Sequence, residues 1–118
     1  MAENKKPTRE DYIKAAAFFR LLQGIWNSDV TLTAASVLKT KDGDRFLHHL
    51  RQAVGYWAWA ETRFFTDYPE RFADELQIFN GNLNTKPLGD NDAEVIRIAK
   101  EIADSLFEKK EAHDGEKL

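Results

Sequence analysis

The chain contains no cysteine, and that absence excludes several kinds of chemistry at once. Disulfide bonds, thiolate metal sites and thiol nucleophiles all need this residue. The sequence also lacks the run of about 20 apolar residues that a membrane-spanning helix requires. Its first residues, MAENKKPTRED, are not followed by an apolar stretch of the signal-peptide kind. We therefore expect a cytoplasmic protein that does not enter a membrane.

Catalytic and cofactor motifs are missing as well. The sequence has no Glu-x-x-His pair, no glycine pattern for a nucleotide and no nucleophile beside an evident base. His48 and His49 are adjacent, so on a helix they point about 100° apart, whereas metal-binding histidines are three or four residues apart. We predict no catalytic, cofactor-binding or metal-binding residues, and no enzymatic activity.

The composition that remains is that of an ordinary globular protein. Of the 118 residues, 42% are hydrophobic and 31% are charged, which suits a single domain with its own core. The charged segments at the two ends, residues 1–7 and 109–118, are expected to be flexible tails. The prediction is therefore one domain over residues 1–118.

The first helix is predicted from about Thr8 to about Trp26, because Thr8 and Asp11 are spaced like a capping box. Apolar residues recur along it at helical spacing, and the stripe is wide enough to imply more than one neighbour. The stripe consists of Tyr12, Ala15, Ala16, Phe19, Leu22 and Trp26, with Phe18, Leu21 and Ile25 at its side.

Residues 30–38 fit two structures. Val30, Leu32 and Ala34 alternate as in a strand, while Val30, Ala34, Val37 and Leu38 also suit a helix. We predict a helix here, because capping residues precede the segment and a lone strand would have no partner. The following KDGD is expected to end this helix with a turn.

The longest helix is predicted from Asp44, a candidate N-cap, to about residue 67, just before Pro69. Its apolar seam, expected to lie in the core, consists of Phe46, Leu50, Ala53, Trp57, Ala60 and Phe64. A further helix is expected from Pro69 to Gly81, burying Phe72, Leu76 and Phe79. The last is expected to start at an Asn91–Glu94 capping pair and to bury Val95, Ala99, Ile102 and Leu106. The predicted fold is an all-α bundle of four to five helices around the long helix, residues 44–67.

A few aromatic landmarks resemble those of a known family. Trp26, the pair Tyr56-Trp57 and the segment DYPERF (residues 67–72) occur in an order similar to that in the small delta subunits of alternative nitrogenases. The likeness covers residues 26–72 and lacks that family's Trp-Asp-Arg and Pro-Trp steps. We transfer no site residue and no activity from it.

The segment GYWAWAETRFF places two residues out of pattern on the long helix. Glu61 falls inside the apolar arc, where it is either a structural carboxylate with a partner or a general base with a raised pKa. Trp59 falls on the opposite side, where it is either covered by another helix or part of a contact surface. In the second case the partner-binding residues are Trp59, Tyr56, Arg63, Gln52 and His48.

Charge is unevenly divided along the chain. Residues 1–63 carry 10 Lys and Arg against 7 Asp and Glu, whereas residues 64–118 carry 7 against 13. This asymmetry favours oriented docking or self-association. We expect a non-enzymatic interaction protein that docks as an accessory or regulatory subunit on a larger protein or complex, and that can form a homo-oligomer. The alternatives are a nucleic-acid-associated regulator that uses the basic half, although we expect weak nucleic-acid binding, and a small-molecule-binding protein that uses Glu61.

Overall fold

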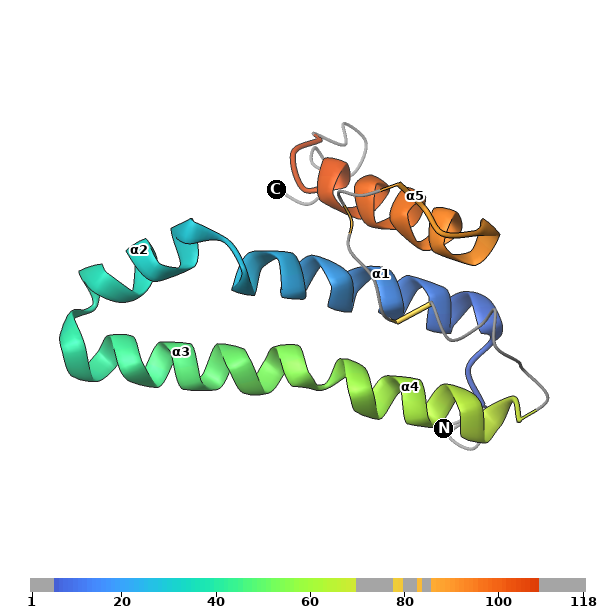
Figure 1. Cartoon of the computed structure of the whole chain (residues 1–118), viewed down its shortest axis with the longest axis horizontal. Coiled ribbons are helices and arrows are strands. Elements are labelled where there is room, and N and C mark those ends of the chain that lie inside the picture. The colour runs from blue at the N-terminus through green and yellow to red at the C-terminus, as the bar shows by residue number, and fades with distance from the viewer. Residues whose placement is uncertain (1–5, 70–77, 80–82, 84–85, 109–118) are drawn as a thin grey trace, which may run out of the picture.

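The computed structural model in Figure 1 describes residues 6–69, 78–79, 83 and 86–108. Within them the helices are α1 (Arg9–Trp26), α2 (Asp29–Val37), α3 (Lys39–Gly55), α4 (Trp57–Asp67) and α5 (Asp90–Ser105). No strand occurs in these ranges, so the predicted all-α class is confirmed, and so is the helical interpretation of the segment that starts at Val30. None of the helices described is long and apolar enough to cross a membrane.

Helix α1 begins with the predicted capping box. The Thr8 hydroxyl accepts a hydrogen bond from the Asp11 backbone N–H (3.1 Å), and the Asp11 carboxylate accepts one from the Thr8 N–H (2.9 Å). These two bonds satisfy backbone donors that the first helical turn leaves without a partner. The start of this 18-residue helix is therefore fixed by interactions between residues close in the sequence.

The buried face of α1 differs in part from the predicted stripe. It consists of Tyr12, Ile13, Ala16, Ala17 and Arg20. Phe18 and Ile25, expected beside the stripe, are half exposed instead. The buried face is rotated relative to the predicted stripe because α1 packs between two neighbours, α4 and α5, and contacts both. The inference that α1 has more than one neighbour is thus confirmed.

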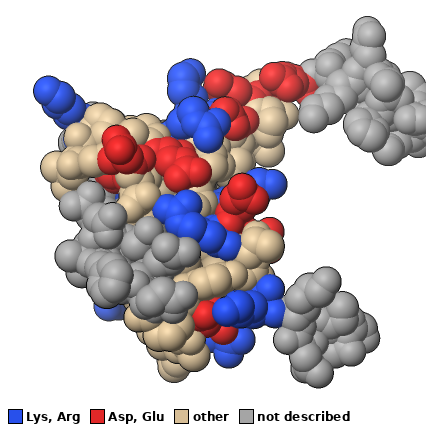
Figure 2. All heavy atoms as spheres, turned by 90° about the vertical axis from the view of Figure 1, so that its right-hand side faces the viewer, with Lys and Arg blue, Asp and Glu red and all other residues tan. Residues whose placement is uncertain are grey.

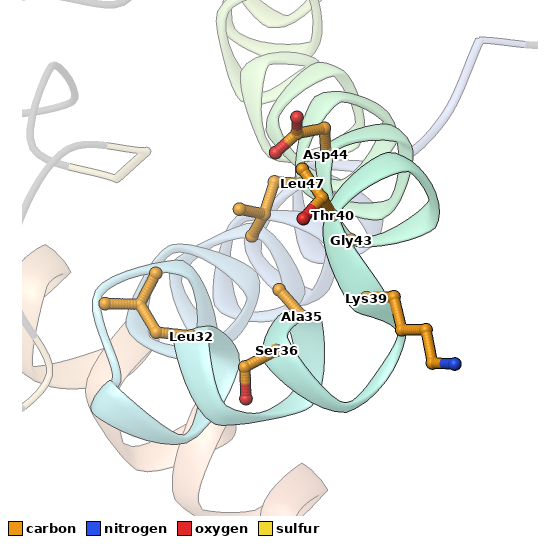
Figure 3. A pocket seen from close by; sticks show the side chains of 8 residues that line it. All are labelled: Leu32, Ala35, Ser36, Lys39, Thr40, Gly43, Asp44 and Leu47. Carbon is orange, nitrogen blue, oxygen red and sulfur yellow. The ribbon is translucent and has the colours of Figure 1, made fainter.

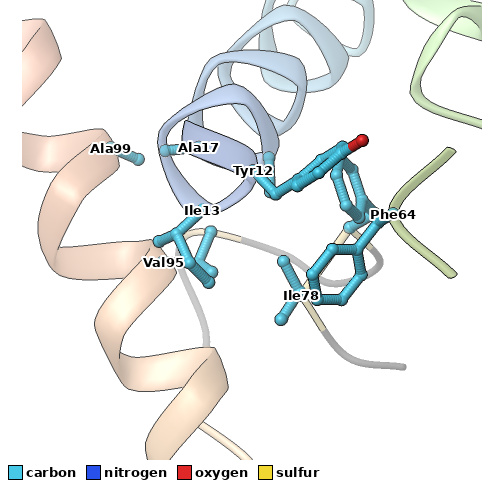
Figure 4. Close-up of a cluster of buried hydrophobic side chains, with 9 residues drawn as sticks. Tyr12, Ile13, Ala17, Phe64, Ile78, Val95 and Ala99 are labelled. Carbon is cyan, nitrogen blue, oxygen red and sulfur yellow. The ribbon is translucent and has the colours of Figure 1, made fainter. Parts of the chain in front are cut away.

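Helix α1 contacts each of the other four helices, and Figure 1 shows α5 on one side of it and α3 and α4 on the other. In the core, drawn in Figure 4, Ile13 and Ala17 lie toward Val95 and Ala99 of α5. On the other side of α1 the Tyr12 ring lies 5.0 Å from the Phe64 ring, measured between centroids. The centre of the bundle is therefore α1, and the long helix that we expected there packs against it.

The join between α2 and α3 contradicts the predicted turn. Residues 41–44, KDGD, lie inside α3, which begins at Lys39 and not at Asp44. The chain reverses direction at Lys39 itself, whose φ of 70° lies in the left-handed region. Gly43 is buried, and a Cβ there would lie 2.4 Å from the Ala35 carbonyl oxygen of α2. This glycine therefore permits close packing of two helices, which the sequence pattern alone does not distinguish from a turn.

Helices α3 and α4 form the predicted long helix, bent at Tyr56 (Figure 1). Gly55 ends α3, and glycine is a residue at which helices bend because it adds little to helix stability. Of the predicted seam, Phe64 is fully buried, Ala53 is exposed, and Phe46, Leu50, Trp57 and Ala60 are half-buried. The seam is only partly covered because α3 contacts α1, α2 and α4 but not α5.

The start of α5 is capped differently from our prediction. The N-cap is Gly89, and the expected capping pair of Asn91 and Glu94 does not form. The Asp92 carboxylate instead accepts a hydrogen bond from the backbone N–H of Leu88 (2.9 Å). An acidic residue in this first turn also interacts favourably with the helix dipole.

The other predictions for the second half have mixed outcomes. Val95 and Ala99 are buried as expected, whereas Leu106 is exposed because α5 ends at Ser105. Phe79 is buried. Pro69, Ile78 and Phe79, however, lie in turns and not in the helix predicted from Pro69 to Gly81. The other residues of that helix, Phe72 and Leu76 among them, lie outside the described residues.

Two residues of the predicted N-terminal tail are held against the end of α4. The Lys6 ammonium donates to the Asp67 carbonyl oxygen (3.0 Å), and the Tyr68 hydroxyl donates to the Pro7 carbonyl oxygen (2.7 Å). Residues 1–5 and 109–118 of the predicted tails lie outside the described residues.

Candidate interaction surface

Near its bend, the long helix has one side packed against the core and one side exposed. Phe64 is fully buried against α1, while Trp59 and Tyr56 are 69% and 58% exposed. These positions follow from helical spacing, because residues five apart on a helix lie on different faces. Trp59 therefore lies on the surface, and the core alternative that the sequence left open for it is excluded.

Beside these aromatic side chains the surface is hollowed. The hollow has a volume of about 530 Å³ and is lined by His49, Gln52, Ala53, Gly55, Tyr56 and Trp59. We call these six residues the Trp59 surface. Gln52, Tyr56 and Trp59 were predicted to act together, and the structure brings them together here.

The other predicted contact residues lie outside the hollow. His48 and Arg63 are exposed but do not line it. His49, Ala53 and Gly55 line it and were missed. The missed signal was spacing, because His49, Ala53 and Tyr56 are four and three residues apart and so share a helix face.

The groups at this surface suit contact better than catalysis. They offer two aromatic rings, an amide and an imidazole, with no carboxylate among them. In the described part of the chain, no three His, Asp or Glu side chains are grouped so that they could hold a metal ion. His48 and His49 have ring centroids 5.5 Å apart and meet edge to face. What the surface can do chemically is stack, exclude water and exchange hydrogen bonds.

Glu61 lies on the packed side of α4. It is half-buried, one turn after Trp57, which packs against the core, and three residues before Phe64. Burial raises the pKa of its carboxyl group above the usual value. Its carboxylate has no ion pair or hydrogen bond to another described residue. The prediction that this acid falls inside the apolar arc is confirmed, but it does not line the Trp59 surface.

A buried ion pair escaped the sequence analysis. Arg20 Nη1 lies 2.6 Å from Asp92 Oδ1, and the two side chains are 1% and 4% exposed. Arg20 Nε also donates to the Ile78 carbonyl oxygen (3.1 Å). Each of these polar groups has a partner, as burial requires, so this pair ties α1 to residue 78 and to the start of α5.

A second hollow lies between α2 and α3, and Figure 3 shows the side chains around it. It has a volume of about 390 Å³ and lies beside the close approach of Gly43 to Ala35. Leu32 and Leu47 give it apolar walls, and Lys39 and Asp44 contribute opposite charges at its rim. We assign it no ligand.

Comparisons with known proteins give no family for this chain. No protein-family model matches the sequence, and searches of curated proteins and of solved structures find no match.

Proposed function

We propose that this protein is a non-enzymatic interaction protein, an accessory or regulatory subunit that docks on a larger protein through the Trp59 surface. The observation that carries the proposal is the exposure of Trp59, at 69%, beside the exposed Tyr56 and a hollow of about 530 Å³. A partner side chain can fill the hollow, and the Trp59 indole can then cover that side chain.

The physical reason lies in the cost of leaving these rings in water. Burying apolar surface stabilises an association by roughly 25 cal/mol per Å², and a tryptophan buries about 150–250 Å². Trp and Tyr also dominate interface energies, usually with polar residues around them that exclude water. Gln52 and His49 lie where such a polar rim is needed.

Nucleic-acid binding has less support than protein docking. The basic residues of α3 are interrupted by acids, and Arg45 lies 4.0 Å from Asp42. Figure 2 shows the end of the molecule where α1 begins and α4 ends. Lys and Arg are mixed there with Asp and Glu, without a large area of one sign. Since sequence-independent binding depends on a basic surface, we expect no affinity tighter than about micromolar at physiological salt.

The test places a photo-reactive phenylalanine analogue at position 59 and irradiates the protein in its source cells. A control carries the analogue at position 107, where the natural Phe107 is 89% exposed but lies outside the Trp59 surface. We expect a defined protein cross-linked from position 59 and absent from position 107. Equal products from both positions would indicate random contact and contradict the proposal.

Purified components then give the affinity. Trp59→Ala is expected to weaken binding of the identified protein by about 30-fold, the equivalent of about 2 kcal/mol for a hot spot, and Phe107→Ala to leave it unchanged. Thermal unfolding of both variants checks that the fold is intact, because exposed substitutions change stability by less than about 0.5 kcal/mol. Binding that is insensitive to Trp59→Ala contradicts the assignment.

A further inference from the structure

Helix α2 has few of the other described elements packed around it. It contacts α3 and α1, but neither α4 nor α5, and Figure 1 shows it at one end of the molecule. Thr31 and Ala35 form its buried face. The opposite face consists of Val30, Thr33 and Val37, all exposed, with the two valines at 70% and 73%. We call these three residues the outer face of α2.

Charged residues stand at the two ends of this face and are absent from its middle. Residues 30–38 carry no charge in a chain of which 31% is charged. Asp29 stands at one end of this stretch and Lys39 at the other, and both are exposed. Neither side chain forms an ion pair within the described residues. An exposed helix with a neutral middle and opposite charges at its ends is complementary to an antiparallel copy of itself.

We propose that the outer face of α2 binds a second copy of this chain, with the two α2 helices antiparallel about a two-fold axis. An axis between Thr33 and Ala34 places Val30 of each copy opposite Val37 of the other. The same axis brings Asp29 of each copy beside Lys39 of the other. An isologous contact of this kind needs one surface to be complementary to itself, and this pattern meets that condition.

The size of the face sets the strength of the contact. A helix of nine residues supplies less than the roughly 1,200 Å² of total buried area that stable complexes need. The dimer is therefore expected to be weak, with a dissociation constant in about the micromolar range. This self-association uses a different helix from the Trp59 surface and does not depend on the function proposed for that surface.

Sedimentation velocity from about 1 μM to about 500 μM tests the dimer itself. The wild-type protein should shift from monomer to dimer as its concentration rises. Val30→Asp combined with Val37→Asp should remain monomeric throughout, while Phe107→Asp, at another exposed apolar position, should behave like the wild type. A wild-type protein that is monomeric at every concentration would overturn the proposal, as would a double variant that dimerises normally.

A charge exchange tests the antiparallel arrangement. Asp29→Lys and Lys39→Asp should each weaken the dimer, since each places like charges together, and the combined variant should recover it. Aspartate tolerates the left-handed backbone of residue 39 better than most residues do. Failure of the combined variant to recover dimerisation would overturn this arrangement.

The absence of cysteine permits a direct test that can trap even a weak dimer. Thr33→Cys places one thiol next to the proposed axis, and mild oxidation should give a disulfide-linked dimer. Ser105→Cys, at an exposed position at the end of α5, is the matched control and should cross-link much more slowly. Equal rates at the two positions would overturn the proposal. So would loss of the dimer in Trp59→Ala, because the interface would then lie on the Trp59 surface.

Discussion

At the scale of single residues, Glu61 is the described acid whose surroundings are least suited to its charge. Burial between the packed positions of α4 raises the pKa of its carboxyl group, so the folded state holds a proton more readily than the unfolded state does. Stability therefore falls as pH rises from the usual glutamate value of 4.5 through the raised value. At neutral pH the ionised carboxylate opposes folding.

We expect Glu61→Gln to stabilise the protein at pH 7. The amide keeps the shape of the side chain and removes the charge that burial disfavours. The gain over the wild type should shrink as pH falls and vanish below 4.5, where the carboxyl group is neutral in both the folded and the unfolded state. Urea unfolding of both proteins at a series of pH values measures the difference.

Glu101 provides the control for this substitution. It is exposed and pairs with Arg97 at 2.6 Å on the surface of α5. Glu101→Gln should lower the free energy of unfolding by no more than about 0.5 kcal/mol at pH 7. If Glu61→Gln costs more than this, then the Glu61 carboxylate is stabilised in the folded state and our account of it is wrong.

The same residues show what a helical pattern can predict. The opposite placement of Trp59 and Glu61 follows from about 100° per residue alone, and both were placed correctly. Arg20 was missed although it shares the face of Ile13, Ala16 and Ala17, because a charge is normally taken to mark the exposed side. Its partner Asp92 lies 72 residues away, so no local signal reveals the pair.

At the scale of helices, the packing of α2 against α3 depends on Gly43. We expect Gly43→Ala to destabilise the protein by about 1–3 kcal/mol, the usual cost of overpacking. The added Cβ would meet the Ala35 carbonyl oxygen at 2.4 Å, and backbone cannot move aside as a flexible side chain can. Denaturant unfolding measures the change.

Gly55 is the matched control for Gly43, since both lie in α3. A Cβ at Gly55 would have no atom within 4 Å, so Gly55→Ala should be neutral or stabilise by up to about 1 kcal/mol through the better helix propensity of alanine. Equal losses in the two variants would contradict the packing explanation, because of these two glycines only Gly43 has an atom within 4 Å of an added Cβ.

Helix boundaries were predictable only where a local interaction sets them. Thr8 and Asp11 cap α1 within one turn, and this start was predicted correctly. KDGD was interpreted as a turn because glycine between aspartates is typical of turns, yet the contact of Gly43 with Ala35 keeps the segment helical. The turn at Lys39 uses a residue that gives no turn signal.

At the scale of the whole molecule, the sequence predicted the all-α class but not which helix lies at the centre. Strong periodicity is sufficient for the class. The arrangement depends instead on contacts between distant residues, since α1 packs against both α4 and α5 through Tyr12 and Ile13. Ala16 and Ala17 are fully buried in α1, and the long helix formed by α3 and α4 lies to one side of it (Figure 1).

Arg20 and Asp92 hold this arrangement together, and they provide the test at this scale. Arg20→Met and Asp92→Leu should each destabilise the protein by about 3–5 kcal/mol, because each removes one side of a buried ion pair. The double variant Arg20→Met with Asp92→Leu should lose less than the two single losses added together, since it removes both charges. Urea unfolding of all four proteins gives the coupling energy.

The pair formed by Arg97 and Glu101 shows why burial, and not distance, decides how much stability is lost when one partner is replaced. Its nitrogen and oxygen atoms are 2.6 Å apart, the same distance as in the Arg20–Asp92 pair, but its side chains are 59% and 62% exposed. Water solvates either charge when the other is removed, so Arg97→Met should cost no more than about 0.5 kcal/mol. If Arg20→Met were equally mild, water would have to reach Asp92, and α5 could not be packed on α1 as described. Additive losses in the double variant would likewise show that the two charges do not interact across the core.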